Sequence, residues 1–272
     1  MFEQYVYAIV LQMASGGVLH LRANIGQSVQ AAFLNTIRAL DGQLAQRLHD
    51  DNQRKLYTTS PLWADSSTVK VGQDVYVRFA FLDSTIAELF VEQFLLYGHN
   101  HTLNIDGIQL SITNIYATPE GHLRAGRLSI TQSDDANCLT QVTLNFITPT
   151  AFSRRNGKRI EYRTDMSPDL VWKYARQMWS HAGGNDPGPE FDNWVRQHCF
   201  IKYSSLIPQR VDFKRFFVSG VHGQVTYVLG GDTPQDEYYR LWCYLSHFAA
   251  YSSIGYKTTM GMGQVMPYIE EQ

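Results

Sequence analysis

Cysteines and long apolar runs are both scarce in this chain of 272 residues. Its 3 cysteines, Cys138, Cys199 and Cys243, lie far apart and are odd in number. This argues against a disulfide framework and against a zinc module. No apolar run approaches the roughly 18 residues of a membrane-spanning helix, and the first residues lack the basic start of a secretory signal. We therefore expect a cytoplasmic protein with no membrane partner.

Excess positive charge is also missing, because 23 lysines and arginines stand against 25 aspartates and glutamates, a formal net charge of −2. Any nucleic-acid partner must then be held by local basic patches and not by the field of the whole protein. The sequence has no Walker phosphate loop, no nucleophile elbow and no spacing typical of metal ligands. We expect neither a metal nor another cofactor.

Apolar residues are abundant, at 44% of the chain with 13% aromatic, which is enough for two cores of ordinary size. Their spacing predicts the order βαββαβ between residues 5 and 116, and again, with an extra hairpin strand, between residues 141 and 269. This order is typical of the ferredoxin-like fold. A polar, glycine-punctuated stretch at residues 119–136 separates the two parts. We expect an α+β protein with two tandem ferredoxin-like (RRM-like) domains, residues 1–125 and 126–272.

Local signals predict where several of these elements begin and end. One continuous helix runs to His49 with Ser28 as its N-cap, and a second helix spans residues 84–98. In the second part, a turn at residues 221–223 separates two strands, and residues 232–234 open the last helix.

A glycine-rich stretch, residues 253–263, follows that last helix. Gly255, Gly261 and Gly263 allow positive φ and let a phosphate or another strand approach the backbone amides. Lys257 adds a cation to the same loop. By itself, the pattern fits an anion-binding loop and a plain connection into a strand equally well.

Basic residues cluster twice in the second part, within residues 154–163 and within residues 196–215. Either cluster fits a solvated face, but both share a domain with the glycine-rich stretch. Arginines and exposed aromatics on a sheet or groove are how ferredoxin-like domains hold RNA.

His49, at the predicted end of the first helix, and Lys55 are the ionisable pair of most interest, because histidine moves protons near neutral pH. The helix dipole also favours a histidine at a helix C-terminus, and Lys55 fits a solvated charge before a strand. Spacing alone favours this structural explanation. His20, after the first strand, is a second candidate, although its alternation with two leucines indicates a surface position.

Three segments together resemble the CRISPR repeat-processing endoribonucleases of the RAMP superfamily. The first is the glycine-rich stretch, in which three glycines match the family pattern and Ser253 stands where a first glycine is expected. The second is Thr-Pro-Thr-Ala-Phe at residues 148–152, and the third runs from Leu48-His49-Asp50 through residues 55–62. Some members use a tyrosine in the first helix, where this chain has only Phe33 and Leu34.

The resemblance implies a metal-independent endoribonuclease that processes CRISPR repeat RNA (pre-crRNA). The sequence itself is compatible with either a monomer or a homodimer. His49 would act as general acid or base and Lys55 would stabilise charge on the phosphorane. The implied RNA-binding residues are Arg154, Arg155, Lys158, Arg159, Gly255, Tyr256, Lys257, Gly261 and Gly263. The alternative is a non-catalytic RAMP-type RNA-binding subunit that stays in a CRISPR effector complex.

Overall fold

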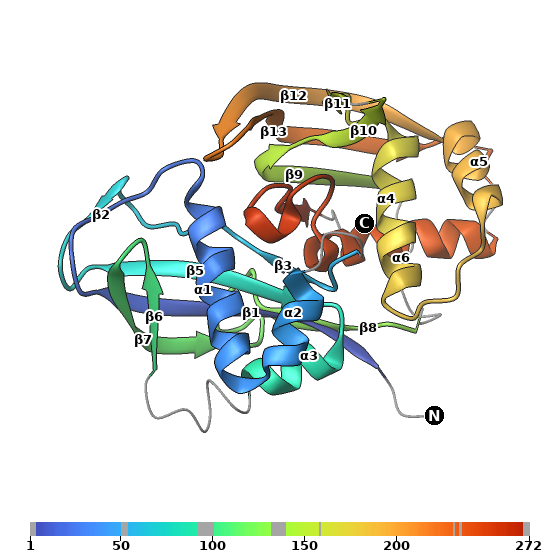
Figure 1. The fold of residues 1–272 in the computed structure, drawn as a ribbon. Helices are drawn as coiled ribbons and strands as arrows, with labels where there is room; N and C mark the ends of the chain where they lie inside the picture. Colours follow the sequence, from blue (N-terminus) through green and yellow to red (C-terminus); the bar gives the residue numbers. More distant parts are fainter. Residues whose placement is uncertain are drawn as a thin grey trace. The chain divides into compact units, whose positions relative to one another are not determined.

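A computed structural model of the chain describes residues 4–49, 54–91, 101–131, 140–157, 159–230, 232–233 and 236–268 (Figure 1). The chain divides into two compact units. The N-terminal unit is Tyr5–Leu128 together with Thr259–Gly261. The C-terminal unit is Ser129–Thr258 together with both ends of the chain, Met1–Gln4 and Met262–Gln272.

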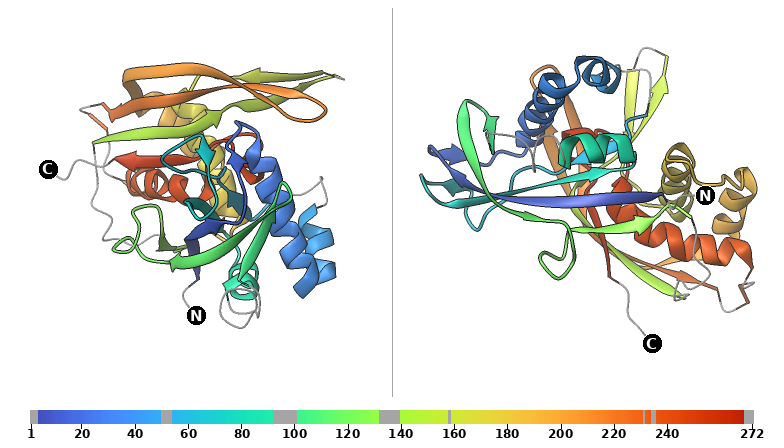
Figure 2. Two further views of the ribbon diagram at one scale, coloured as in Figure 1. Left: turned by 90° about the vertical axis from the view of Figure 1, so that its left-hand side faces the viewer. Right: turned by 90° about the horizontal axis from the view of Figure 1, so that it is seen from below.

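The N-terminal unit is built around a 6-stranded sheet with helices on one of its faces (Figure 1, Figure 2). Its elements are β1 (Tyr5–Ser15), β2 (Leu19–His20), α1 (Ile25–Leu40), α2 (Gly42–His49), β3 (Tyr57–Thr59), β4 (Thr68–Val69), β5 (Asp74–Phe81), α3 (Ser84–Glu88), β6 (Thr102–Ile105), β7 (Ile108–Tyr116) and β8 (Gly126–Ser129). The sheet order is β3-β5-β1-β7-β6, with β8 also paired to β1, while β2 and β4 form a separate pair. The order β3-β5-β1-β7 is the ferredoxin-like arrangement of a βαββαβ unit.

Alternation along the strands decides which face the helices cover. Leu11 and Met13 of β1 belong to the buried core, whereas Gln12 between them faces the other way. From α1, Phe33 packs its ring against four aromatic rings of the core at centroid distances of 4.7 to 6.1 Å. Burying such a side chain contributes about 1.5 to 3 kcal/mol, so Phe33 anchors α1 to the sheet.

The C-terminal unit repeats this architecture. Its elements are β9 (Gln141–Thr150), β10 (Phe152–Asn156), β11 (Arg159–Arg163), α4 (Pro168–His181), α5 (Pro189–His198), β12 (Cys199–Asp212), β13 (Phe217–Leu229), α6 (Glu237–Ser252) and β14 (Val265–Tyr268). Its sheet order, β12-β13-β9-β14, again places the second, third, first and fourth strands side by side. The prediction of an α+β protein with two tandem ferredoxin-like domains is confirmed.

The first predicted helix is interrupted, so the expectation of one continuous helix to His49 was wrong. The first segment, α1, begins at Ile25 with Asn24 as N-cap, and Asp41 then takes an extended conformation (φ −146°, ψ 101°). The Asp41 carboxylate accepts hydrogen bonds from the amides of Gln43 and Leu44, both at 2.9 Å. Asp41 therefore acts as the N-cap of a new helix, α2. Ser28, the predicted N-cap, lies within α1.

The turn predicted at residues 221–223 was also wrong, because β13 runs through these residues. Gly223 has φ 127° and lies where the β9–β13 register shifts. A Cβ atom there would lie 2.1 Å from the Ser205 carbonyl oxygen on the neighbouring strand. The glycine therefore permits a bulge and a close strand approach. The turn instead follows β12, where the Phe213 amide donates to the Phe216 carbonyl at 2.8 Å.

Other element ends differ in smaller ways. The last helix begins at Glu237, later than predicted, because the Asp236 carboxylate accepts hydrogen bonds from the amides of Tyr238 and Tyr239, at 3.0 and 3.1 Å. The second helix begins at Ser84 with Asp83 as N-cap, and its predicted end at Gly98 lies outside the described residues. None of the helices in the described ranges is long and apolar enough to span a membrane.

Candidate active site and nucleic-acid interface

His49 is the final residue of α2 and its side chain is exposed. The opposite side of this short helix packs Leu44, Ala45 and Leu48 into the core of the N-terminal unit. This amphipathic pattern directs His49 to solvent. A terminal histidine fixed by a packed helix has the access that a general acid or base requires.

Lys55 lies two residues before β3 and is half-buried. The backbone beside it is fixed, because the Leu82 amide donates to the Leu56 carbonyl at 2.8 Å and Tyr57 is 0% exposed. Between His49 and Lys55, residues 50–53 lie outside the described ranges. The two predicted catalytic residues thus lie in the same unit, His49 at the end of α2 and Lys55 just before the next element, β3.

His20 has a different setting. It ends β2 in the separate two-stranded sheet, is exposed, and lies with Nδ1 3.2 Å from the Thr68 hydroxyl.

The glycine-rich stretch and residues 148–152, two of the segments that carry the family resemblance, are hydrogen-bonded to each other. The Tyr256 amide donates to the Ala151 carbonyl at 2.7 Å, and the Gly263 amide donates to the Pro149 carbonyl at 3.0 Å. The Gln264 amide donates to the Thr148 hydroxyl at 2.9 Å. Segments about a hundred residues apart thus build one structure in the C-terminal unit.

The three glycines of this loop are buried and shape its backbone. Gly255, Gly261 and Gly263 have φ values of 98°, 88° and 71°. A Cβ atom would lie 2.4 Å from the Ala151 carbonyl oxygen at Gly255 and 2.1 Å from the Ile254 carbonyl oxygen at Gly263. Several loop amides, including those of Ile254 and Tyr256, already donate to protein carbonyls. These amides are therefore committed to the fold.

The tip of the loop, Thr259–Gly261, belongs to the N-terminal unit. The Gln30 side-chain amide on α1 donates to the Thr259 hydroxyl at 2.8 Å, and the Thr59 hydroxyl on β3 donates to the Thr259 carbonyl at 2.9 Å. Gly26 of α1 leaves room for this tip, since a Cβ atom there would lie 2.2 Å from the Met260 carbonyl oxygen. Two elements of the N-terminal fold thus fix the tip.

Lys257 lies among aromatic rings. Its Nζ atom is 5.1 Å from the ring centroid of Tyr256 and 5.4 Å from that of Phe216, within cation–π range. The Tyr256 ring in turn lies 5.8 Å from the ring of Tyr162 on β11. The sequence contained no signal for Tyr162 or Phe216, because these contacts join segments far apart in the chain.

More positive charge and aromatic surface follow at the β12–β13 turn. Lys214 and Arg215 are exposed, Phe216 is 38% exposed and Phe217 is 47% exposed. The Arg210 guanidinium lies 3.9 Å from the centroid of the Phe217 ring. In proteins that bind single-stranded nucleic acid, cations contact the phosphates and aromatic rings stack on the bases. The exposed cations and rings at this turn are of the same kinds.

The hairpin β10–β11 separates the predicted arginines by register. Arg155 pairs with Ile160 and Ser153 pairs with Tyr162, so Arg155 and Tyr162 share one face. Arg154 pairs with Glu161 on the other face. Arg159 pairs with Asn156 in the backbone register, and Lys158 lies outside the described residues. The predicted basic cluster is therefore not a single patch.

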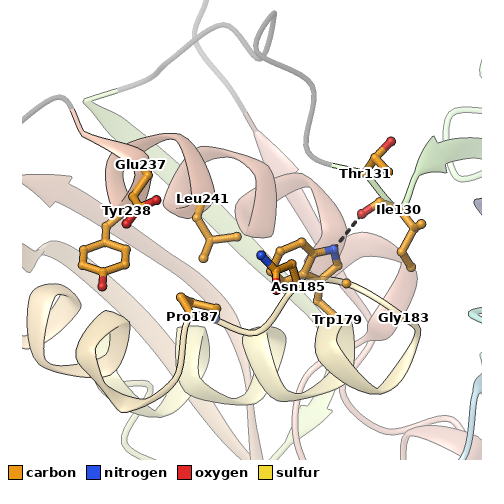
Figure 3. Close-up of a pocket in the computed structure, with 10 residues that line it drawn as sticks. Ile130, Thr131, Trp179, Gly183, Asn185, Pro187, Glu237, Tyr238 and Leu241 are labelled. Carbon is orange, nitrogen blue, oxygen red and sulfur yellow. Dashed lines mark hydrogen bonds between the residues drawn. The ribbon is translucent and has the colours of Figure 1, made fainter.

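A pocket of about 540 Å³ also lies in the C-terminal unit (Figure 3). Trp179 forms part of its lining and donates its indole N–H to the Ile130 carbonyl at 2.9 Å. None of the predicted site residues lines it. In the described part of the chain, no group of three or more His, Cys, Asp or Glu side chains is arranged to hold a metal ion.

Comparison with known proteins bears on both units. Residues 5–126 match the family profile of the CRISPR Cas6 N-terminal domain, and residues 144–265 match that of the CRISPR-associated endoribonuclease Cas6. The chain belongs to the Cas6 family. It is thus a member of a family of CRISPR repeat-processing endoribonucleases, as the resemblance predicted. Comparison with curated protein sequences found no match.

Solved Cas6 structures share the fold. A Thermus thermophilus Cas6 is 21% identical with a TM-score of 0.73, over 98% of this chain and 100% of the other. A product complex of that Cas6 is 24% identical with a TM-score of 0.81, over 97% of this chain and 100% of the other. A Cas6-related protein from Pyrococcus furiosus is 14% identical with a TM-score of 0.60, over the full length of both chains.

Proposed function

We propose that this Cas6-family protein cuts CRISPR repeat RNA without a metal ion and so produces guide RNAs. The observation that carries the proposal is the match of both domains to the Cas6 family, combined with an exposed histidine, His49, at the end of α2. Lys55, which is close to His49 in the sequence and lies before β3, is the proposed catalytic cation.

The proposed reaction is an internal transfer at the scissile phosphate. The ribose 2′-OH attacks the adjacent phosphorus in line, and the bond to the 5′ oxygen breaks. The products are a 2′,3′-cyclic phosphate and a 5′-OH. His49 either accepts the proton of the 2′-OH or donates a proton to the departing 5′ oxygen, and Lys55 stabilises the negative charge of the phosphorane.

RNA binding is assigned to the surface around Lys257 in the C-terminal unit. Lys257, Arg155, Lys214 and Arg215 provide phosphate contacts, and the neighbouring rings, including Tyr256, stack on bases. Gly255, Gly261 and Gly263 hold the loop in the conformation that presents Lys257. Arg154, Lys158 and Arg159, on the same hairpin as Arg155, are assigned contacts with further phosphates.

The test is cleavage of labelled repeat RNA from the host's own arrays. We expect cleavage to survive EDTA, to stop when the 2′-OH at the cut is replaced by hydrogen, and to fall on the order of 10²- to 10⁴-fold in His49→Ala while binding persists. His181→Ala is the matched control, because His181 is also an exposed histidine at the end of a helix, α4.

Each part of the proposal can fail separately. Cleavage at the wild-type rate in His49→Ala would overturn the site assignment. Loss of cleavage in EDTA would overturn the metal-independent mechanism. Repeat binding without product at any excess of wild-type protein would identify the chain as a non-catalytic RAMP-type subunit of an effector complex.

A further inference from the structure

The face of the N-terminal sheet opposite its helices carries a row of polar and aromatic side chains. Gln12 of β1 pairs with Tyr76 of β5 on one side and with Asn114 of β7 on the other. Trp63 joins this row through two backbone hydrogen bonds with Tyr76, at 2.8 and 3.0 Å. The row therefore crosses three central strands on the face that the helices leave uncovered.

Four rings gather along this row. The Trp63 and Tyr76 rings are stacked at 5.9 Å with an interplanar angle of 18°. The His122 ring lies 6.1 Å from Trp63, 6.2 Å from Tyr76 and 5.8 Å from Tyr116. All four side chains are partly exposed. They form a cluster, here called the sheet-face cluster, at the surface of the protein.

The polar neighbours hold these rings in place. Gln12 Oε1 accepts from the Tyr116 hydroxyl at 2.6 Å and from the Asn114 side-chain amide at 2.9 Å. Gln12 also donates its own side-chain amide to Asp74 at 2.7 Å. These bonds use both ends of the Gln12 amide, so they fix the Tyr116 ring without burying it.

The surroundings of His122 favour its neutral form. Burial lowers the pKa of His122, and the positive charges of Arg124 and Arg78 lower it further. Its Nδ1 atom accepts from the Arg124 amide at 3.1 Å, so the proton of the neutral ring lies on Nε2. Arg124 also lies over the Trp63 ring, with its Cζ atom 4.9 Å from the centroid. The cluster thus presents flat rings and one guanidinium.

Trp63 differs from the other tryptophans of the chain. Trp63 is half-buried, whereas the others are at most 6% exposed: Trp172, Trp179, Trp194 and Trp242. Next to the cluster, Leu123 is 83% exposed. Packing explains the four buried tryptophans, but it does not explain a partly exposed stack on a sheet face. In RRM domains, which share the βαββαβ order, aromatic rings on the sheet face stack on unpaired bases.

Local charge indicates how such a ligand would bind. Burial raises the pKa of Tyr76, and Asp74, Tyr116 and Asp65 raise it further. Near Tyr76, the negative charges of Asp74 and Asp65 thus accompany the positive charges of Arg124 and Arg78, which act on His122. Stacking, more than attraction of phosphates, would therefore provide the binding energy here.

We propose that Trp63, Tyr76, Tyr116 and His122 form a stacking platform for unpaired nucleotides of the RNA that this protein processes. The inference rests on the proposed function, because it takes RNA as the ligand. His49 ends a helix that packs on the opposite face of the same sheet. The platform therefore contacts nucleotides away from the scissile phosphate and contributes to RNA binding, not to the chemical step.

Tryptophan fluorescence tests the platform directly, since Trp63 is the only tryptophan of the chain that is not buried. Wild-type protein is titrated with a short unstructured oligoadenylate, and with repeat RNA with and without its unpaired flanks. We expect oligoadenylate and flanked repeat to quench the fluorescence, and Trp63→Phe, which keeps a ring, to remove the quenching.

Variants then measure the contribution to binding. Trp63→Ala and Tyr76→Ala should each weaken binding of oligoadenylate on the order of 10-fold, and should raise KM for flanked repeat while kcat stays unchanged. Tyr76→Phe should bind as the wild type does. Tyr203→Ala, which removes a 57% exposed ring on β12, is the control outside the cluster, and thermal melts verify folding.

The outcomes separate this inference from the proposed function. If the wild type cleaves repeat RNA but shows no quenching, and the variants bind oligoadenylate normally, the platform is overturned and the function stands. If the wild type cleaves nothing but oligoadenylate quenches Trp63, the cleavage proposal fails and the platform is supported. If an alanine variant unfolds, the Trp63→Phe titration decides.

Discussion

Ser253 occupies a position where the family pattern has a glycine, and it adopts a backbone conformation that glycine favours. Its backbone has φ 54° and ψ 178°, a region that glycine adopts freely and other residues adopt at a cost of about 1 to 3 kcal/mol. The side chain is 0% exposed, and its hydroxyl accepts a hydrogen bond from the Gln264 side-chain amide at 2.8 Å. The serine thus keeps the conformation of the expected glycine and adds a buried hydrogen bond.

Two substitutions separate these effects. Ser253→Gly and Ser253→Ala both lose the hydrogen bond to Gln264, but only the alanine keeps the strain. We expect Ser253→Gly to be more stable than Ser253→Ala by about 1 to 3 kcal/mol, measured by urea unfolding. At ordinary positions alanine is the more stable of the two by about 0.5 to 1 kcal/mol. That ordinary order at this position would show that the backbone is unstrained.

At the scale of elements, α1 contains a glycine where helix propensity alone would favour alanine. A Cβ atom at Gly26 would lie 2.2 Å from the Met260 carbonyl oxygen. Gly42, at the start of α2, has nothing within 4 Å of such an atom. The two glycines therefore provide a matched comparison between close packing and propensity.

We expect Gly26→Ala to destabilise the protein by about 1 to 3 kcal/mol, because overpacking displaces the loop tip. Gly42→Ala should be neutral or stabilising by up to about 1 kcal/mol, from helix propensity. Thermal unfolding of both variants measures this. A shift of both melting temperatures in the same direction would contradict the role assigned to Gly26.

The β10–β11 register predicts unequal roles for two adjacent arginines. Arg155 shares the face of Tyr162, whose ring lies beside Tyr256 and so near Lys257, whereas Arg154 lies opposite Glu161. We expect Arg155→Ala to weaken repeat binding more than Arg154→Ala, and to reduce the salt slope of binding by about 1, as for the loss of one phosphate contact. Filter binding at several salt concentrations tests this. Equal losses would show that the two faces of the hairpin contribute equally to RNA binding, and would contradict this prediction.

At the scale of the whole molecule, a net charge of −2 means that RNA is attracted only to local cationic surfaces. Seven cations are assigned to phosphates in the proposed function: Lys257, Arg155, Lys214, Arg215, Arg154, Lys158 and Arg159. We therefore expect log Kd to change with log salt concentration with a slope of about 5 in magnitude. A slope near zero would remove these residues from the interface. A much steeper slope would require cations beyond these seven.

Most of the architecture was readable from the sequence, because it depends on local periodicity. Alternation in the strands and helical spacing in the helices indicate which side chains face a core. From these patterns the sequence predicts two βαββαβ units. Three short segments resembled the RNA-processing family, and the matches of both domains confirm that the chain belongs to the Cas6 family. The roles of His49, Lys55 and the RNA-binding residues remain predictions.

What depended on contacts between distant segments was decided only by tertiary structure. Asp41 divided the predicted first helix because its carboxylate caps a new helix, α2. Gly223 lies at a bulge within β13, because the neighbouring strand approaches it closely. The register of one hairpin separated Arg154 from Arg155, and two strands, β5 and β7, together with the segment at Trp63 placed three rings around His122. Such contacts involve residues tens to hundreds of positions apart, and local periodicity contains no information about which distant segments will pair.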